Sequence, residues 1–237
     1  MTTIAQSGVA RERYTVRSLL GAGSNEVRKM SDLKPIVFVV DDDISVRESL
    51  ELLIKNAGWQ PELYASAPEF LSRARSAVPS CLVLDVTLPG LNGLELQRQL
   101  ADRNDVPIVF ITGHGDVPMS VRAMKAGAVE FLTKPFNDGV LLQAIEAAIE
   151  RSRVALRFES EMRALRERHE SLTPRERQVM ALVVLGLLNK QVGAELGISE
   201  ITVKLHRGQV MRKMNARSLP DLVTMADRLG LRLPGPH

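Results

Sequence analysis

Carboxylate, hydroxyl and ammonium side chains follow short apolar runs in the first two thirds of the chain. They are Asp41, Asp42, Asp85, Thr112 and Lys134. Three carboxylates brought close together repel one another, and a divalent cation with oxygen ligands relieves this repulsion. Mg2+ suits such a site because it keeps several waters and can add a phosphate oxygen. The set therefore indicates a magnesium site that handles phosphate.

The chemistry that these side chains allow is attack of a carboxylate on phosphorus, which forms an acyl phosphate. A metal ion and an ammonium would neutralise charge on the equatorial oxygens, while a hydroxyl donates to one of them. One carboxylate must be the nucleophile and the others metal ligands. Asp85 stands alone at the end of its apolar run, between the Asp41–Asp42 pair and Thr112, and we expect it to be the nucleophile.

The elements that must position these groups alternate between apolar runs and amphipathic stretches. Runs of four to six residues rich in Val and Ile predict buried parallel strands. They are Ile36–Val40, Glu62–Ala65, Cys81–Asp85, Ile108–Ile111 and Val129–Leu132. Right-handed crossovers place the intervening helices on both faces of the sheet. We predict an α/β domain with a doubly wound five-stranded sheet of order 2-1-3-4-5, whose ligands bind where strands 1 and 3 end.

The last third of the chain has the pattern of a second, all-α domain. Thr173-Pro174-Arg175-Glu176 predicts a capping box with Pro at the first helical position. The stretch Lys190–Leu196 is followed by the turn Gly197-Ile198-Ser199 and by a helix through Lys213, for which Ser199 is a good N-cap. Short helices around a tight turn predict a helix-turn-helix.

Charge separates the two predicted domains. In the 237 residues, positions 31–150 carry 17 acidic against 10 basic residues, whereas positions 151–237 carry 16 basic against 9 acidic. The basic end is suited to nucleic acid or an acidic surface. The single cysteine, Cys81, rules out a disulfide framework and any Cys-pair zinc site. Without an apolar stretch near the ~20 residues that span a bilayer, we expect a cytoplasmic protein with no membrane contact.

The predicted second helix of the helix-turn-helix has two unlike faces. Projection at 100° per residue places Val203, Val210 and Met214 on the inward face. The face able to enter a major groove has four central and two flanking residues: Lys204, Leu205, Gly208 and Arg212, with Thr202 and Arg207 near its edges.

Individual contacts on this face follow from side-chain chemistry. Lys204 is suited to a guanine edge and Leu205 to a thymine methyl group. The residues expected to hold phosphates are Arg207, Arg212, Lys190 and the Ser199 end of the helix. Gly208 either permits close approach of the backbone to DNA or removes one base contact.

The first group of motifs resembles a response-regulator receiver domain over about residues 34–150. The motifs are Val-Val-Asp41-Asp42, Leu-Asp85-Val-Thr-Leu-Pro89-Gly90-Leu-Asn-Gly93, Ile-Thr112-Gly-His-Gly and Leu-Thr-Lys134-Pro135-Phe136. The resemblance implies that Asp85 accepts a phosphoryl group from the phosphohistidine of a sensor kinase. Asp41, Asp42 and Asp85 would then hold Mg2+ together with the backbone carbonyl of Thr87.

The same resemblance assigns a switch. Lys134 and Thr112 would contact the phosphoryl oxygens, Phe131 takes the place of the aromatic switch residue, and the Lys134-Pro135 bond is expected to be cis. Asp43 stands where the family often has Glu, and it is given no direct role.

The second group of motifs resembles the LuxR-type DNA-binding domain over residues 171–230. It comprises Leu-Thr173-Pro-Arg-Glu176-Arg, Asn189-Lys190, Leu-Gly197-Ile-Ser199 and Thr202-Val-Lys204-Leu-His206-Arg207. With a FixJ-like receiver ahead of it, the architecture is that of a two-component transcription regulator. Phosphorylation would produce a homodimer that binds double-stranded promoter DNA, and RNA polymerase is a candidate further partner. No enzyme activity is expected beyond self-phosphorylation and dephosphorylation.

We expect four segments. Residues 1–33 form an N-terminal extension with little order, 34–150 the receiver, 151–170 a linker helix and 171–237 the DNA-binding domain. Translation that starts at Met30 is one hypothesis, which intact-mass measurement decides. The linker helix is either a solvated connection or a short coiled-coil dimer contact.

Two other functions fit parts of the sequence. A strand followed by Asp41-Asp42-Asp43 also resembles the start of haloacid-dehalogenase-type phosphatases, in which the first Asp is the nucleophile. The further acidic pair of that family would fall near Gly115-Asp116, but position 120 is Ser. The other alternative is a protein-binding adaptor whose basic helices contact no DNA; its interactions would lack the steep salt dependence of phosphate contacts.

Overall fold

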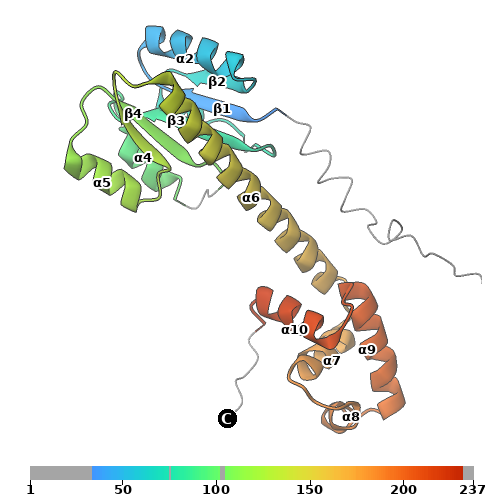
Figure 1. The fold of residues 1–237 in the computed structure, drawn as a ribbon. Coiled ribbons are helices and arrows are strands. Elements are labelled where there is room, and N and C mark those ends of the chain that lie inside the picture. The colour runs from blue at the N-terminus through green and yellow to red at the C-terminus, as the bar shows by residue number, and fades with distance from the viewer. Residues whose placement is uncertain (1–33, 75, 102–104, 232–237) are drawn as a thin grey trace, which may run out of the picture.

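The computed structural model describes residues 34–74, 76–101 and 105–231 (Figure 1). The expectations for residues 1–33, the Met30 start and the last six residues lie outside these ranges. The elements of the first domain are β1 (Ile36–Val40), α2 (Ile44–Asn56), β2 (Gln60–Tyr64), α3 (Ala67–Leu71), β3 (Ser80–Asp85), α4 (Gly93–Gln99), β4 (Ile108–Thr112), α5 (Val117–Lys125) and β5 (Glu130–Thr133). The remaining helices are α6 (Asp138–Glu170), α7 (Pro174–Val184), α8 (Asn189–Leu196), α9 (Glu200–Met214) and α10 (Leu219–Arg228).

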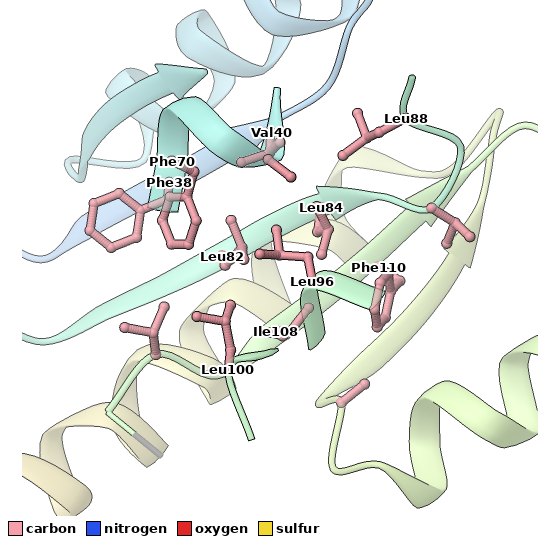
Figure 2. Packing of buried hydrophobic residues seen from close by; sticks show 14 of the residues in the cluster. Phe38, Val40, Phe70, Leu82, Leu84, Leu88, Leu96, Leu100, Ile108 and Phe110 are labelled. Atoms are coloured by element: carbon pink, nitrogen blue, oxygen red, sulfur yellow. The ribbon is translucent and has the colours of Figure 1, made fainter. Parts of the chain in front are cut away.

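The five strands form one parallel sheet of order β2-β1-β3-β4-β5, which confirms the predicted fold class. Side chains of β1 alternate between the two faces, as strand geometry requires. Phe38 and Val40 enter a core with residues of α3, α4 and α5, part of which Figure 2 shows. Val37 and Val39 enter the opposite core with residues of α2 and α6. Helices therefore cover both faces of the sheet.

Two helices, α3 and α10, begin at signals that the sequence analysis did not name. Ser66 caps α3 and Ser218 caps α10 through side chains that accept from backbone amides, and each helix has Pro at its start. A serine two residues ahead of a proline is a helix-start signal, so local sequence could have predicted both. The expected strand Glu62–Ala65 begins earlier, as Gln60–Tyr64, because Gln60 and Pro61 pair with Ile36 and Val37.

The helix α6 runs without interruption from the receiver to the C-terminal helices (Figure 1), as the sequence predicted. Its first half packs on the sheet through Ile145 and Ile149. Met162 and Leu165 belong to the core of the C-terminal domain, with residues of α7, α8, α9 and α10. These two apolar side chains of the linker are therefore buried within the chain itself, although Val154 and Phe158 stay exposed.

A buried serine joins α6 to the sheet. The Ser152 hydroxyl donates to the carbonyl of Asp105 and accepts from the backbone amide of Ser80, 3.0 Å away. Both Ser152 and Ser80 are buried, so the bond satisfies an amide at the start of β3 that water cannot reach. This contact fixes α6 at the point where it leaves the receiver.

The helix-turn-helix is held by a close approach of backbones at Gly193 in α8. A Cβ atom there would lie 2.7 Å from the carbonyl oxygen of Ile198 in the turn. Val203, Val210 and Met214 of α9 are buried in the same core, as predicted. Glycine at position 193 therefore lets the turn pack directly on α8.

Candidate functional site

Strand register brings the predicted acidic and basic groups to one edge of the sheet. Val40 of β1 pairs with Leu84 of β3, so the next residues, Asp41 and Asp85, lie side by side. Asp85 pairs with Ile111, one residue before Thr112, and Thr112 pairs with Thr133, one residue before Lys134. Four adjacent strand ends thus supply the site.

Lys134 connects two of the carboxylates directly. Its Nζ lies 2.7 Å from Oδ2 of Asp41 and 2.7 Å from Oδ2 of Asp85. Burial by itself would lower the pKa of Lys134, but the hydrogen bonds with Asp41 and Asp85 outweigh it and raise the pKa above its usual value. The lysine therefore stays a cation between two buried carboxylates.

Asp41 is fully buried, and burial raises the pKa of its carboxyl group despite the hydrogen bonds from Lys134 and from the backbone amide of Asp43. Asp42, in contrast, is exposed. One carboxylate oxygen from each of Asp41, Asp42 and Asp85 lies within 4.8 Å of the others. Three clustered oxygen donors are the ligand type that Mg2+ prefers, so these residues fit the ion that the sequence predicted.

The backbone around Asp85 is set by a glycine of the predicted motif. A Cβ atom on Gly93 would lie 2.5 Å from the carbonyl oxygen of Asp85, and the Gly93 amide donates to Val86. Oδ1 of Asp85 accepts from the amide of Thr87 at 2.9 Å. Any larger residue at position 93 would push α4 away from the end of β3.

The predicted switch residues lie next to each other. Thr112 is fully buried, and its hydroxyl accepts from the His114 amide at 3.2 Å. The half-buried ring of Phe131 packs on Phe110 with 6.0 Å between centroids, and a Cβ on Gly115 would lie 3.0 Å from it. The Lys134-Pro135 peptide bond is cis, as expected.

Two residues near the site were missed or left without a role. Asp43 caps α2 by accepting from the Ser45 amide at 2.8 Å, which an Asp immediately before a helix could have indicated. Arg47 donates to the carbonyl of Asp41 at 2.6 Å, a contact that no sequence signal marks. Both therefore hold the backbone that carries the acidic pair.

The predicted nucleic-acid face of α9 has the expected exposure. Lys204, Leu205, Gly208 and Arg212 are exposed, while Thr202 and Arg207 are half-buried at its edges. Ser199 caps the helix by accepting from the Thr202 amide at 3.1 Å, and Lys190 is exposed on α8. The structure thus leaves the predicted residues exposed or half-buried on α8, on α9 and at the turn between them.

Two ion pairs connect helices of the C-terminal domain, one of them half-buried and the other exposed. The Lys213 ammonium lies 2.6 Å from Glu176 and donates to the Ser171 carbonyl at the end of α6. The hydrogen bond from Lys213 lowers the pKa of Glu176, which is buried. Arg228 of α10 pairs with Glu161 of α6 at 3.0 Å.

Comparison with known proteins gives the class. Residues 37–146 match the response regulator receiver domain, and residues 170–226 match the bacterial regulatory proteins of the luxR family. Nodulation protein W of Bradyrhizobium diazoefficiens is 55% identical over 199 residues, covering 84% of this chain and 88% of its own. Transcriptional regulatory protein FixJ of Rhizobium meliloti is 46% identical over 191 residues, covering 80% and 94%. The structure of response regulator StyR covers 83% of this chain and 100% of its own, with 50% identity and a TM-score of 0.74.

The chain belongs to the two-component response regulators that join a receiver domain to a LuxR-type DNA-binding domain and act on transcription. This confirms the predicted FixJ-like architecture, and it excludes the phosphatase and adaptor alternatives because the family consists of transcription regulators. A sensor kinase and DNA are the partners that this class implies. Within the described residues no helix is long and apolar enough to cross a membrane.

Proposed function

We propose that Asp85 accepts a phosphoryl group from a sensor histidine kinase and that the phosphorylated protein binds promoter DNA as a homodimer. The observation that carries the proposal is the Lys134 ammonium, held 2.7 Å from both Asp41 and Asp85 at the ends of β1 and β3. A cation already placed beside a carboxylate can stabilise the added negative charge as that carboxylate becomes an acyl phosphate.

The transfer uses groups of this chain at stated atoms. A carboxylate oxygen of Asp85 attacks phosphorus, the new O–P bond forms, and the N–P bond of the phosphohistidine breaks while the leaving imidazole takes up a proton. Lys134 then pairs with a phosphoryl oxygen, and the Thr112 hydroxyl donates to another. The chemistry is limited to the protein's own phosphorylation and dephosphorylation.

Mg2+ is the cofactor that we propose for this step. Asp41, Asp42 and Asp85, together with the backbone carbonyl of Thr87, would hold it, and the clustered oxygens of the three carboxylates support this set. When bound, the ion neutralises charge on the phosphoryl oxygens and on the buried carboxylates.

The response to phosphorylation is proposed to pass through Thr112 and Phe131. As the Thr112 hydroxyl moves towards the phosphoryl group, the half-buried Phe131 ring turns inward and changes the surface of α5 and β5. Three apolar residues of α5 support dimerisation there because they are exposed at spacings of four and three, on one side of the helix. They are Val117, Val121 and Met124.

The dimer would place two α9 helices in successive major grooves, about one helical turn apart. The proposed DNA contacts are Lys190, Ser199, Thr202, Lys204, Leu205, Arg207, Gly208 and Arg212, and their exposed or half-buried positions support the assignment. RNA polymerase is the further partner that we propose for a promoter-bound regulator. Because a promoter-binding regulator works where transcription takes place, we place the protein in the bacterial cytoplasm.

We also propose the division into a receiver at 34–150, a linker at 151–170 and a DNA-binding domain at 171–237, preceded by an extension at 1–33. The matches at 37–146 and 170–226 and the single helix between them support these limits.

Asp85→Asn tests the proposal most directly. We expect radiolabelled acetyl phosphate with Mg2+ to label the wild-type chain and not this variant, and dimer formation to disappear with the label. Asp43→Asn is the matched control, because Asp43 caps α2 and touches no phosphate in the proposal; it should keep the label. Labelling of Asp85→Asn at the wild-type level, or a wild-type chain that takes no label, would contradict the assignment.

A further inference from the structure

The outward face of α9 carries an apolar residue that the proposed DNA contacts do not include. Ile201 is 79% exposed and Leu205, one turn further on, is 63% exposed. Ile201 and the buried Val210 are nine residues, or two and a half helical turns, apart and so lie on opposite sides of α9. Ile201 therefore points directly away from the domain core. A Cβ added at Gly208, the next position on this stripe, would have no atom within 4 Å.

The charged side chains around this stripe form ion pairs or hydrogen bonds with neighbouring side chains. Lys204 pairs with Glu200 at 3.2 Å, and Arg207 donates to Asn189 at 3.2 Å. Arg212 donates to Gln209 on its own helix. At 100° per residue, Lys204 and Arg207 lie on one side of the line from Ile201 to Leu205, and Arg212 lies further along it. The first two turns of α9 therefore present an apolar pair, Ile201 and Leu205, bordered by cations that can reach phosphates or base edges.

The major groove offers one apolar group to such a centre, the C5-methyl of thymine. In helix-turn-helix proteins the N-terminal residues of the recognition helix contact base edges, and Ile201 is the second residue of α9. We propose that Ile201 is a further sequence-reading residue, which contacts a thymine methyl beside the one contacted by Leu205. This inference rests on the proposed entry of α9 into the major groove.

Helix geometry limits where the two methyl groups lie. Four residues of an α-helix rise about 6 Å, and base pairs of B-DNA are spaced by about 3.4 Å. Ile201 and Leu205 therefore reach bases about two steps apart. Each half-site should contain two thymines at about this separation, on either strand.

The experiment uses the full chain after treatment with acetyl phosphate and Mg2+. Duplexes are first selected from a random pool, and each thymine of the selected half-site is then replaced by deoxyuridine, which lacks only the methyl group. Loss of one buried methyl contact should weaken binding about fourfold. We expect two thymine positions at which the replacement weakens binding of the wild type. At one of them the replacement should not change the affinity of Ile201→Ala, and at the other it should not change the affinity of Leu205→Ala.

Val154→Ala is the matched control, because Val154 is a β-branched, exposed residue on the linker helix α6. It should bind as the wild type and keep both responses to deoxyuridine. Ile201→Ala should keep the salt dependence of binding, since an apolar contact releases no counterions. The midpoint temperature of its thermal unfolding should not fall, because Ala is a better helix former than Ile.

Three results would overturn the inference. The first is that Ile201→Ala binds the selected duplex as tightly as the wild type. The second is that its affinity falls on deoxyuridine replacement at the same positions as that of the wild type. The third is that the substitution lowers the affinity for selected and for random duplexes by the same factor. The last result would assign Ile201 to another surface contact, such as one with a protein partner. A wild-type chain that selects no sequence would overturn the proposed DNA-binding function as well, which separates the two failures.

Discussion

The two functional regions of this protein are built in opposite ways. In the receiver, Lys134, Asp41 and Asp85 lie at the ends of three strands and are mostly buried, and Lys134 is bonded to both carboxylates. On α9, Lys204, Leu205 and Arg212 come from one helix and are exposed, and the two charged side chains bond to residues of the same helix. The first region should therefore respond to substitution as a unit, and the second as a set of nearly independent residues.

The largest expected effect is at Lys134. Lys134→Met leaves two buried carboxylates side by side and should destabilise the receiver by about 3 kcal/mol in Mg2+-free buffer. With Mg2+ present, the same variant should be phosphorylated at least tenfold more slowly than the wild type. Adding Asp41→Asn removes one of the charges and should recover part of that stability. Denaturant unfolding with a chelator present measures both variants. A double variant less stable than Lys134→Met alone would show that the site does not act as a unit.

A smaller effect is expected where α6 joins the sheet. Ser152→Ala removes the hydroxyl that satisfies the Ser80 amide and the Asp105 carbonyl, and it should cost about 1–3 kcal/mol of receiver stability. Ser120→Ala, which removes an exposed hydroxyl on α5, should change stability by less than about 0.5 kcal/mol. Equal effects of the two variants in urea unfolding would argue against a role for Ser152 in holding α6.

The ion pair between Glu176 and Lys213 should make the stability of the C-terminal domain depend on pH. The pKa of Glu176 is lowered by its bond with Lys213, so the pair's contribution to stability is present above the ordinary value of 4.5 and is lost as pH falls through the lowered pKa. Glu176→Gln should therefore lower stability by about 1–2 kcal/mol at pH 7, and the difference from the wild type should shrink below pH 4.5.

Thermal unfolding between pH 7 and pH 3 measures that difference for the C-terminal transition. Glu161→Gln, which removes the exposed partner of Arg228, is the control and should differ little from the wild type at any pH. A Glu176→Gln difference that stays constant down to pH 3 would exclude the ion pair as its cause.

The smallest effects are expected on the exposed face of α9. Arg212→Gln should weaken binding to specific and random duplexes alike and reduce the slope of log affinity against log salt by about one. Lys204 and Arg212 lie two turns apart, so the free-energy effects of Lys204→Gln and Arg212→Gln should add. Fluorescence anisotropy titrations of the two single variants and the double variant measure these effects. If the free-energy change of the double variant differed strongly from the sum of the two single changes, α9 would respond as a unit, as the receiver site does, and the contrast between the two regions would be lost.

Local pattern was sufficient for much of the fold. Apolar runs marked the five strands, and Thr173 and Ser199 marked helix starts that the structure confirms. Ser66 and Ser218 carry the same kind of helix-start signal. Where an element depends on a neighbour, pattern was insufficient: β2 begins at Gln60 because β1 offers a partner there.

The sequence by itself determined which residues meet at the sheet edge, because the order of parallel strands and the place where each apolar run stops are properties of the chain. Only the tertiary structure decided how those residues pair: Lys134 reaches carboxylates 93 and 49 positions away in the sequence. It also placed Ser152 against Ser80, and Met162 within the C-terminal core. Such contacts depend on which groups fill a shared buried space, and no spacing along the chain encodes that.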